Sequence, residues 1–181
     1  MWRLPEAKRI LDFMFSLLII VVFIPLWLLI ALAVKLTIPG SILFRQTRIG
    51  KDEKPFEILK FRTLCENGQS QSSKLGLFLR RTKLDETPQL LNILEGKMSF
   101  VGPRPYIPEE SVGLQKERYS VRPGLTGLAQ VNGNTFLTWE ERTAYDVEYV
   151  RNQSLLLDFK ILLRTIRVIL KGEEACLKHY K

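Results

Sequence analysis

The chain has 181 residues, enough for one domain with a modest core, and carries a formal net charge of +8. This charge favours anionic partners, but nucleic acid is not expected, because no zinc-finger spacing or RRM-type aromatic motif occurs. The two distant cysteines, Cys65 and Cys176, argue against a disulfide framework or a zinc site and suit a reducing cytosol. The only histidine is His179, so acid–base or nucleophilic chemistry must come mainly from carboxylates, lysines or hydroxyls.

A long apolar run covers residues 13–34 and contains no charged side chain. As a straight helix it would measure roughly 33 Å, enough to cross a hydrocarbon core of about 30 Å. Pro25 lies near its middle, where it removes a helix hydrogen bond and predicts a kink. Basic residues flank both ends, so the positive-inside rule selects no orientation. Two interpretations stay open: a re-entrant helix that returns at Pro25, and a single-pass anchor that tolerates the proline. The run is too long for a cleavable signal peptide.

The soluble part begins with two segments that alternate enough to suggest extended structure, residues 41–50 and 54–64. A polar stretch at residues 66–74 is predicted to be a mobile loop. Turns are expected at Pro123-Gly124 and Asn132-Gly133. Helices are expected at residues 75–81, 87–95 and 139–151, the second with Pro88 in its first turn and Gly96 at its end.

The stretch "LLLDFKILLRTIRVILKG" near the end of the chain predicts an amphipathic helix. One stripe of this helix is apolar and another is basic. The apolar stripe contains Phe159, Leu162, Leu163, Ile166, Ile169 and Leu170. The basic stripe contains Lys160, Arg164, Arg167 and Lys171. The pattern fits a helix that lies on an anionic membrane surface, but a core helix with a solvated basic face remains an equal alternative.

Two adjacent acids, Asp85 and Glu86, stand at or just before the start of the helix expected at residues 87–95. Acids at such a position usually cap the helix. Nearby cations suggest a phosphate site instead: Lys60, Arg62, Arg80, Arg81 and Arg104, the last held between two prolines. Carboxylates in a phosphate site need a bridging cation such as Mg²⁺, or one of them acts as a nucleophile. The spacing does not assign these two parts.

Several long motifs, in the same order, resemble the monotopic phosphoglycosyl transferases, a family of bacterial sugar transferases. They are "KRILD" before the membrane segment, "RQTRIG", "FEILKFRTL", "LDETPQLLNILEGKMSFVGPRP", "VRPGLTGLAQVNG" and "SLLLDFKIL". The resemblance runs almost end to end. It implies an α+β, mainly helical fold with a re-entrant (helix-break-helix) membrane segment, interfacial amphipathic helices and a small β element. Residues 1–36 would form the re-entrant segment with its flanks, and residues 37–181 a cytosolic, membrane-associated catalytic domain.

The resemblance also implies a reaction, a cellular location and a set of active-site residues. A sugar-1-phosphate would pass from a UDP-sugar to polyprenyl (undecaprenyl) phosphate with release of UMP, at the cytoplasmic face of the bacterial inner membrane and with Mg²⁺ as cofactor. Expected partners are these substrates, inner-membrane lipids and a second copy of the chain. By position, Asp85 matches the nucleophile that carries a covalent phosphosugar, and Glu86 its companion acid; both would bind the metal. The expected substrate-binding residues are Lys60, Arg80, Arg104, Arg122 and Asp158. For Asp158, a surface ion pair with basic residues of the amphipathic helix is the alternative.

Four positions depart from the family pattern: Ile24 replaces serine, Leu64 methionine, Thr87 leucine and Asn134 arginine. The change at Asn134 puts the donor sugar in doubt. Two other functions remain as rivals. A membrane-anchored module that only binds acidic headgroups would tolerate amides at positions 85 and 86. A lipid pyrophosphatase or phosphatase would release free phosphate rather than UMP.

Overall fold

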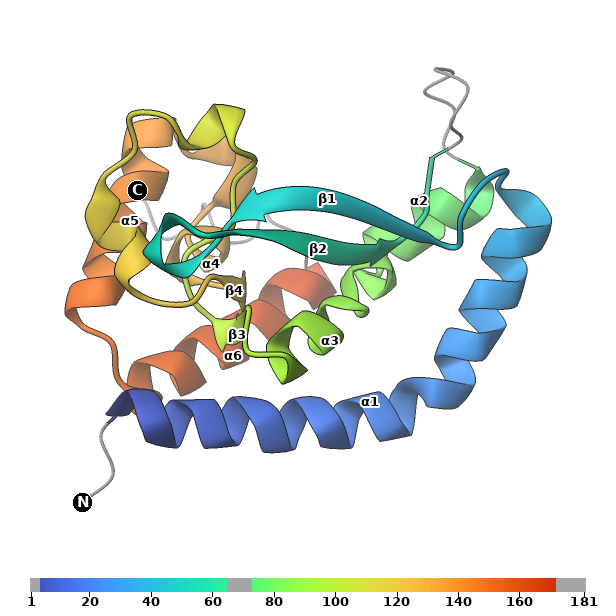
Figure 1. Ribbon diagram of the computed structural model, residues 1–181, viewed down its shortest axis with the longest axis horizontal. Helices are drawn as coiled ribbons and strands as arrows, with labels where there is room; N and C mark the ends of the chain where they lie inside the picture. The colour runs from blue at the N-terminus through green and yellow to red at the C-terminus, as the bar shows by residue number, and fades with distance from the viewer. Residues whose placement is uncertain (1–3, 65–72, 172–181) are drawn as a thin grey trace.

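The computed structural model describes residues 4–64 and 73–171. Cys65, Cys176, His179 and most of the predicted loop at residues 66–74 lie outside these ranges. The described chain is mainly helical, with one antiparallel hairpin and one short parallel strand pair (Figure 1). This confirms the expected α+β, mainly helical class. The expected division at residues 36 and 37 stays a prediction.

The first helix, α1, spans Leu4–Thr37 and contains Pro25. Figure 1 shows that α1 changes direction sharply partway along, so that its two arms lie along two sides of the molecule. Pro25 cannot donate the backbone hydrogen bond of its turn, and its ring crowds the preceding turn, which accounts for a bend without loss of helical structure. Among the described helices, Glu6–Thr37 alone is long and apolar enough to cross a membrane.

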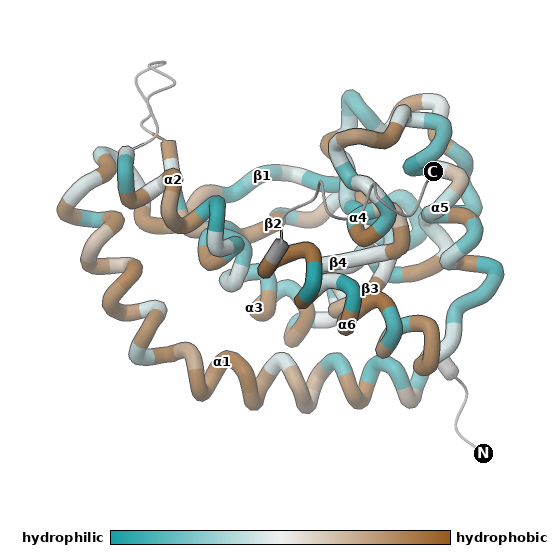
Figure 2. The backbone as a smooth tube through the Cα atoms, turned by 180° about the vertical axis from the view of Figure 1, so that it is seen from behind, coloured by the Kyte–Doolittle hydropathy of each residue, from teal (hydrophilic) through white to brown (hydrophobic). Residues whose placement is uncertain are grey.

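Both arms of α1 contact the rest of the chain. Near its start, Lys8 forms a buried ion pair with Asp158. Near its end, Val34 is buried in a cluster with Phe61 and Leu79. Most of the remaining side chains of α1 are apolar and exposed. Figure 2 colours much of this helix brown, the hydrophobic end of the scale. The helix is therefore held at both ends by the same folded body while it presents a continuous apolar face outward.

The two extended segments form a hairpin. Strand β1, Leu43–Ile49, pairs antiparallel with β2, Pro55–Phe61, and the register places Leu43 opposite Phe61. The hairpin turns through Lys51–Glu53, where Asp52 and Glu53 both have positive φ. Both strands agree with the sequence prediction.

Two short helices follow the hairpin, α2 at Lys74–Arg81 and α3 at Gln89–Leu94. Gly96 follows α3 with a φ of 84°, a conformation that side chains disfavour, and so ends the helix as predicted. Asn92 of α3 accepts a hydrogen bond from the Leu59 amide at 3.1 Å and donates to the Glu57 carbonyl at 2.8 Å. This amide side chain fixes α3 against β2, and thereby fixes the segment that precedes α3.

A parallel strand pair, β3 at Ser99–Val101 and β4 at Gly124–Thr126, was not predicted. The turn expected at Pro123-Gly124 is wrong, because Gly124 begins β4. A Cβ atom at Gly124 would lie 2.1 Å from the Gly102 amide nitrogen, so the glycine permits close approach of two backbones rather than a reversal. Strands of three residues that pair across a long loop leave no periodic pattern in the sequence.

Three helices complete the fold: α4 at Leu128–Val131, α5 at Trp139–Arg151 and α6 at Leu155–Lys171. The turn predicted at Asn132-Gly133 follows α4, and α5 has its predicted bounds with a capping box formed by Thr138 and Glu141. In α6, Asp158 and Ile161 face inward and are buried. The predicted apolar stripe faces mostly outward; Phe159 is 57% exposed and Ile166 56%. The stripe is therefore not the core-facing side of α6.

Candidate active site

The two acids lie in a tight connection between α2 and α3. Lys83 adopts the left-handed conformation with a φ of 58°, and a 3₁₀ turn, Leu84–Glu86, follows it directly. Pro88 occupies the N-cap of α3, and no side chain caps that helix. The capping interpretation of Asp85 and Glu86 therefore finds no support. A non-glycine residue with positive φ costs free energy, and such strain is concentrated at functional sites.

Asp85 is only 7% exposed, and its Oδ1 atom is buried without a hydrogen-bond partner. Burial raises the pKa of this carboxyl, and the neighbouring charge of Glu86 raises it further, against Lys60, Lys83 and Arg80. An unpaired buried carboxylate oxygen is costly to maintain. Asp85 is thus a poorly solvated carboxylate, and one of its oxygens has no hydrogen-bond partner.

Glu86 has the opposite environment. It accepts a hydrogen bond from Lys60 Nζ at 2.7 Å, and both side chains are about one-fifth exposed. Burial would raise the pKa of Glu86, but the charge and hydrogen bond of Lys60, with help from Arg104 and Lys83, outweigh it and lower the pKa. Two adjacent carboxyls whose pKa values move apart are typical of acids with different tasks.

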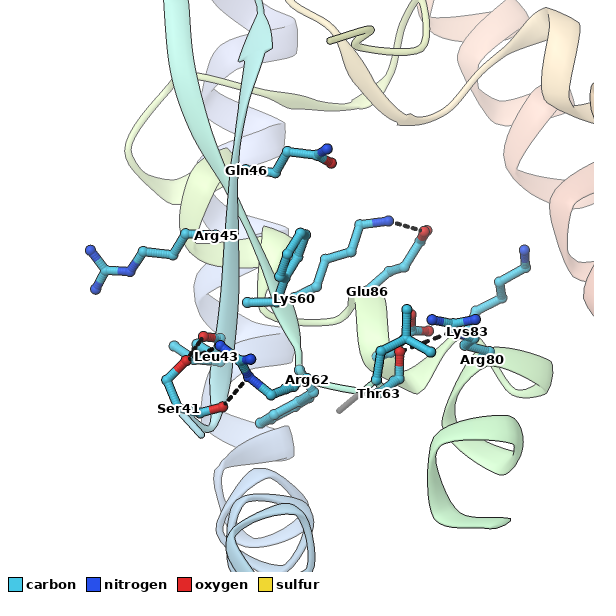
Figure 3. A pocket seen from close by; sticks show the side chains of 14 residues that line it. Ser41, Leu43, Arg45, Gln46, Lys60, Arg62, Thr63, Arg80, Lys83 and Glu86 are labelled. Carbon is cyan, nitrogen blue, oxygen red and sulfur yellow. Dashed lines mark hydrogen bonds and ion pairs between the residues drawn. The ribbon is translucent and has the colours of Figure 1, made fainter. Parts of the chain in front are cut away.

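A large cavity opens in front of Asp85. Its volume is about 1160 Å³, and its lining comes mainly from the hairpin and from the α2–α3 connection (Figure 3). Basic side chains dominate its charge: Arg45, Lys60, Arg62, Arg80 and Lys83, against Asp85 and Glu86. Figure 3 shows Lys60 and Glu86 pointing toward one another, and Arg80 beside Thr63. Such a cavity suits a polyanion of nucleotide-sugar size.

Two contacts hold the walls of this cavity in place. Arg80 Nε donates to Thr63 Oγ1 at 2.8 Å, which ties the end of α2 to the segment after β2. Trp27 Nε1 of α1 donates to Thr87 Oγ1 at 2.9 Å, directly after the two acids. Thr87, which departs from the family pattern, therefore has a partner on α1.

Arg104 lies on another side of Glu86. It does not line the large cavity; it borders two smaller ones that also include Glu86. Its carbonyl accepts a hydrogen bond of 2.6 Å from Arg118, whose guanidinium is buried against Asp146 at 2.8 Å. A buried, hydrogen-bonded ion pair thus fixes the backbone at Arg104.

The structure separates two predicted residues from these acids. Arg122 Nε donates to the Gly96 carbonyl at 2.7 Å, beyond the far end of α3, and lines none of the three cavities that contain Glu86. Asp158 is buried between Lys8 and Tyr149, whose hydroxyl donates to it at 2.7 Å. This ion pair is buried and connects α6 to α1, so it is not the surface ion pair considered as the alternative. The structure brings together Lys60, Arg80, Asp85 and Glu86, with Arg104 nearby.

Three residues that border the acids were not selected from the sequence: Thr63, Lys83 and Gln130. Lys83 had a detectable signal, since it lies two positions before Asp85. Gln130 lies in the quoted motif "VRPGLTGLAQVNG", but nothing in that motif placed it beside the acids, because the β3–β4 pair that precedes α4 was not predicted.

The described residues offer few side-chain ligands for a metal ion. Within residues 4–64 and 73–171, no group of three or more His, Cys, Asp or Glu side chains could hold a metal ion. The two adjacent carboxylates suit Mg²⁺, which commonly binds through one or two carboxylates and completes its shell with water and substrate phosphates. Both carboxylates line the large basic cavity.

Comparison with known proteins establishes the class. Residues 4–172 match the model of the bacterial sugar transferase family, and the chain belongs to that family. It is therefore a transferase, as its acid pair and basic cavity suggest.

Its relatives include the UDP-glucose:undecaprenyl-phosphate glucose-1-phosphate transferase of Caulobacter vibrioides, 42% identical over 93% of this chain and 71% of that protein. The protein of the same name from Escherichia coli is 40% identical over 88% of this chain but only 39% of its own length. A UDP-N-acetylgalactosamine-undecaprenyl-phosphate N-acetylgalactosaminephosphotransferase from Aeromonas hydrophila is 35% identical over 91% of the chain and 44% of that protein. The relatives thus share this region while differing in sugar and in total length.

Proposed function

We propose that this chain transfers a sugar-1-phosphate from a UDP-sugar to a polyprenyl phosphate, with release of UMP. The observation that carries the proposal is the placement of Asp85. It is a buried carboxylate with an unpartnered oxygen, beside the Lys60–Glu86 ion pair, at the wall of a basic cavity. The names of the relatives support the same pair of substrates.

In the first half-reaction, Asp85 attacks the phosphorus that carries the sugar. A bond forms between the carboxylate oxygen and phosphorus, and the bond from that phosphorus to the bridging oxygen breaks, so that UMP leaves with the electron pair. Poor solvation makes Asp85 more basic than an ordinary aspartate and strengthens it as a nucleophile. Lys60 and Arg80 offset the negative charge of the phosphoryl oxygens.

In the second half-reaction, an oxygen of the polyprenyl phosphate attacks the same phosphorus. The bond to Asp85 breaks, and the free carboxylate returns. The low pKa of Glu86 keeps this residue ionised throughout, so it suits a metal ligand better than a proton donor. Bound Mg²⁺ would neutralise phosphate charge and lessen its repulsion from the two acids.

We also propose that α1 enters the membrane from the cytoplasmic face and returns to it. A spanning helix would place its ends about 30 Å apart across the hydrocarbon core. Here Lys8 at one end and Val34 at the other both contact the same folded body, and the outward surface between them is apolar. The exposed apolar stripe of α6 would enter the same interface.

The topology is tested by labelling single reporters in intact cells, one before Arg3 and one at Cys65 with Cys176 removed. Both reporters should resist a periplasmic reagent and react after permeabilisation. Opposite accessibility of the two would mean that α1 spans the membrane.

The reaction is tested with purified protein, radiolabelled UDP-sugars and undecaprenyl phosphate. Formation of a lipid-linked sugar phosphate together with equimolar UMP is the expected result. Release of free phosphate would favour the phosphatase alternative. An Asp85→Asn variant that transfers sugar phosphate at the wild-type rate would exclude the proposed role of that residue.

A further inference from the structure

A second cavity lies on another side of Glu86 and differs in character from the first. Its volume is about 370 Å³, and most of its lining is apolar. Ile19 and Phe23 of α1 form one wall, and Leu162 and Ile169 of α6 form another. Both helices expose many apolar side chains outward. The cavity therefore lies between the surfaces that would contact lipid.

The polar end of this cavity is at Glu86, the second of the two acids. Lys83 and Glu86 line both the large basic cavity and the apolar one, so the two cavities share a border. Arg104 and Gln130 also lie at this end. A ligand in the apolar cavity would thus have an anionic group near cations and a hydrocarbon part between α1 and α6.

Gln130 gives an independent sign of a ligand. Both polar atoms of its amide are buried, and neither has a hydrogen-bond partner in the described structure. A buried amide without partners is costly and calls for an occupant that is not part of the chain. Because Gln130 also lines the small cavity beside Arg104 and Glu86, its amide lies where a phosphate at Arg104 could accept from it.

We propose that the cavity between α1 and α6 holds the first prenyl units of the lipid acceptor, and that Gln130 donates from its amide to the acceptor's phosphate. This inference rests on the proposed function for the identity of the lipid. The cavity matches this ligand in charge and polarity. Arg104 and Lys83 lie at its polar end, where the phosphate would bind, and its other walls, which the prenyl units would contact, are mostly apolar. UDP-sugar would occupy the large basic cavity, and the two substrates would meet at Asp85 and Glu86.

The wall of the cavity can be tested with a matched pair on α6. Leu162 lines the cavity, whereas Leu163 belongs to the same exposed stripe and does not. Leu162→Trp should raise the KM for undecaprenyl phosphate at least tenfold and leave the KM for UDP-sugar unchanged. Leu163→Trp should change neither by more than twofold. Equal lipid KM values for the two variants would overturn the proposal.

A second measurement does not depend on turnover. A polyprenyl phosphate with a diazirine on the prenyl unit nearest its phosphate is photolysed with the full chain in neutral-lipid nanodiscs, and labelled peptides are identified by mass spectrometry. Label should appear on the peptides that contain Phe23 or Leu162, and undecaprenyl phosphate should compete while phosphatidylglycerol should not. Gln130→Leu should reduce this labelling severalfold.

Equal competition by phosphatidylglycerol, or labelling unaffected by Gln130→Leu, would overturn the proposal, since the cavity would then be a general lipid contact. A wild-type chain that labels as expected but transfers no sugar phosphate would instead contradict the proposed reaction alone.

Discussion

Two of the three cavities that border Glu86 differ in character: the larger is rich in basic side chains, and the one between α1 and α6 is mostly apolar. The larger one is lined by Arg45, Arg62 and Arg80 and opens beside the hairpin. The smaller one is lined by Ile19, Leu162 and their neighbours and lies between the helices that present apolar surface. The contrast fits the proposed function, in which a water-soluble substrate and a lipid would approach the acids from separate directions.

The same contrast extends to the acids themselves. Asp85 has an unpartnered oxygen and a raised pKa, whereas Glu86 is paired with Lys60 and has a lowered pKa. Asp85 therefore lacks a stabilising partner, whereas Lys60 stabilises Glu86 as an anion. Substitutions at and around these two acids test whether Asp85 and Glu86 have separate roles.

Metal removal should have the largest effect. The two carboxylates and the phosphates of the donor require a cation between them, and hard oxygen ligands prefer Mg²⁺. Chelation followed by dialysis should reduce transfer to background, and added Mg²⁺ should restore it. Full activity in protein verified as metal-free by elemental analysis would remove the metal from the mechanism.

Lys60→Met should lower kcat by about 10²-fold, a typical cost of losing one charge-stabilising donor. The pKa of Glu86 should rise when its partner is lost, so the acid limb of the pH–rate profile should move to higher pH. Lys54→Met, an exposed residue next to the same strand, is the control. An unmoved acid limb would mean that Glu86 does not need Lys60 to remain ionised.

Trp27→Phe should have a smaller effect, because it removes one hydrogen bond from α1 to Thr87, worth about 1 kcal/mol. The free energy of unfolding should fall by about that amount, and kcat should fall less than tenfold. Thr87→Val removes the same bond from the other side, so the double variant should lose no more stability than the more damaging single variant. Additive losses would show that the two side chains act separately.

Asp85→Asn should stabilise the ligand-free protein slightly. The folded pKa of Asp85 lies above its unfolded value, so its ionised form disfavours folding at neutral pH, and this penalty fades as the pH falls through the folded pKa. The gain at pH 7 should be about 1 kcal/mol, the usual size of a single-site change, and should vanish in acid. Asp52→Asn, at an exposed turn, provides the comparison in thermal unfolding. A destabilised Asp85→Asn variant would contradict the poorly solvated environment described for this carboxylate.

The sequence predicts elements whose pattern is local. The hairpin, α5 and the acids before α3 follow from alternation, capping residues and spacing, and the bend of α1 follows from Pro25. The β3–β4 pair depends on Gly124 meeting Gly102 across a long loop, which no local pattern encodes. Gln130 enters the site through that pair and was missed for the same reason.

Asp158 shows that the position of a residue in a sequence motif does not reveal its partners in the fold. Its place in the motif "SLLLDFKIL" suggested substrate binding, but its partners are Lys8, which lies 150 residues earlier, and Tyr149. Tyr149 lies only nine residues before Asp158, but Lys8 belongs to α1, and only the tertiary fold brings it to α6.

The most direct test of the account mixes the enzyme, Mg²⁺ and UDP-sugar without any lipid acceptor. If Asp85 is the nucleophile, up to one UMP per active site should be released, and the peptide that contains Asp85 should gain the mass of a sugar phosphate. Asp85→Asn should abolish both signals. Release of UMP only when polyprenyl phosphate is present, with no adduct on the wild-type chain, would contradict the account and indicate direct transfer between the two substrates.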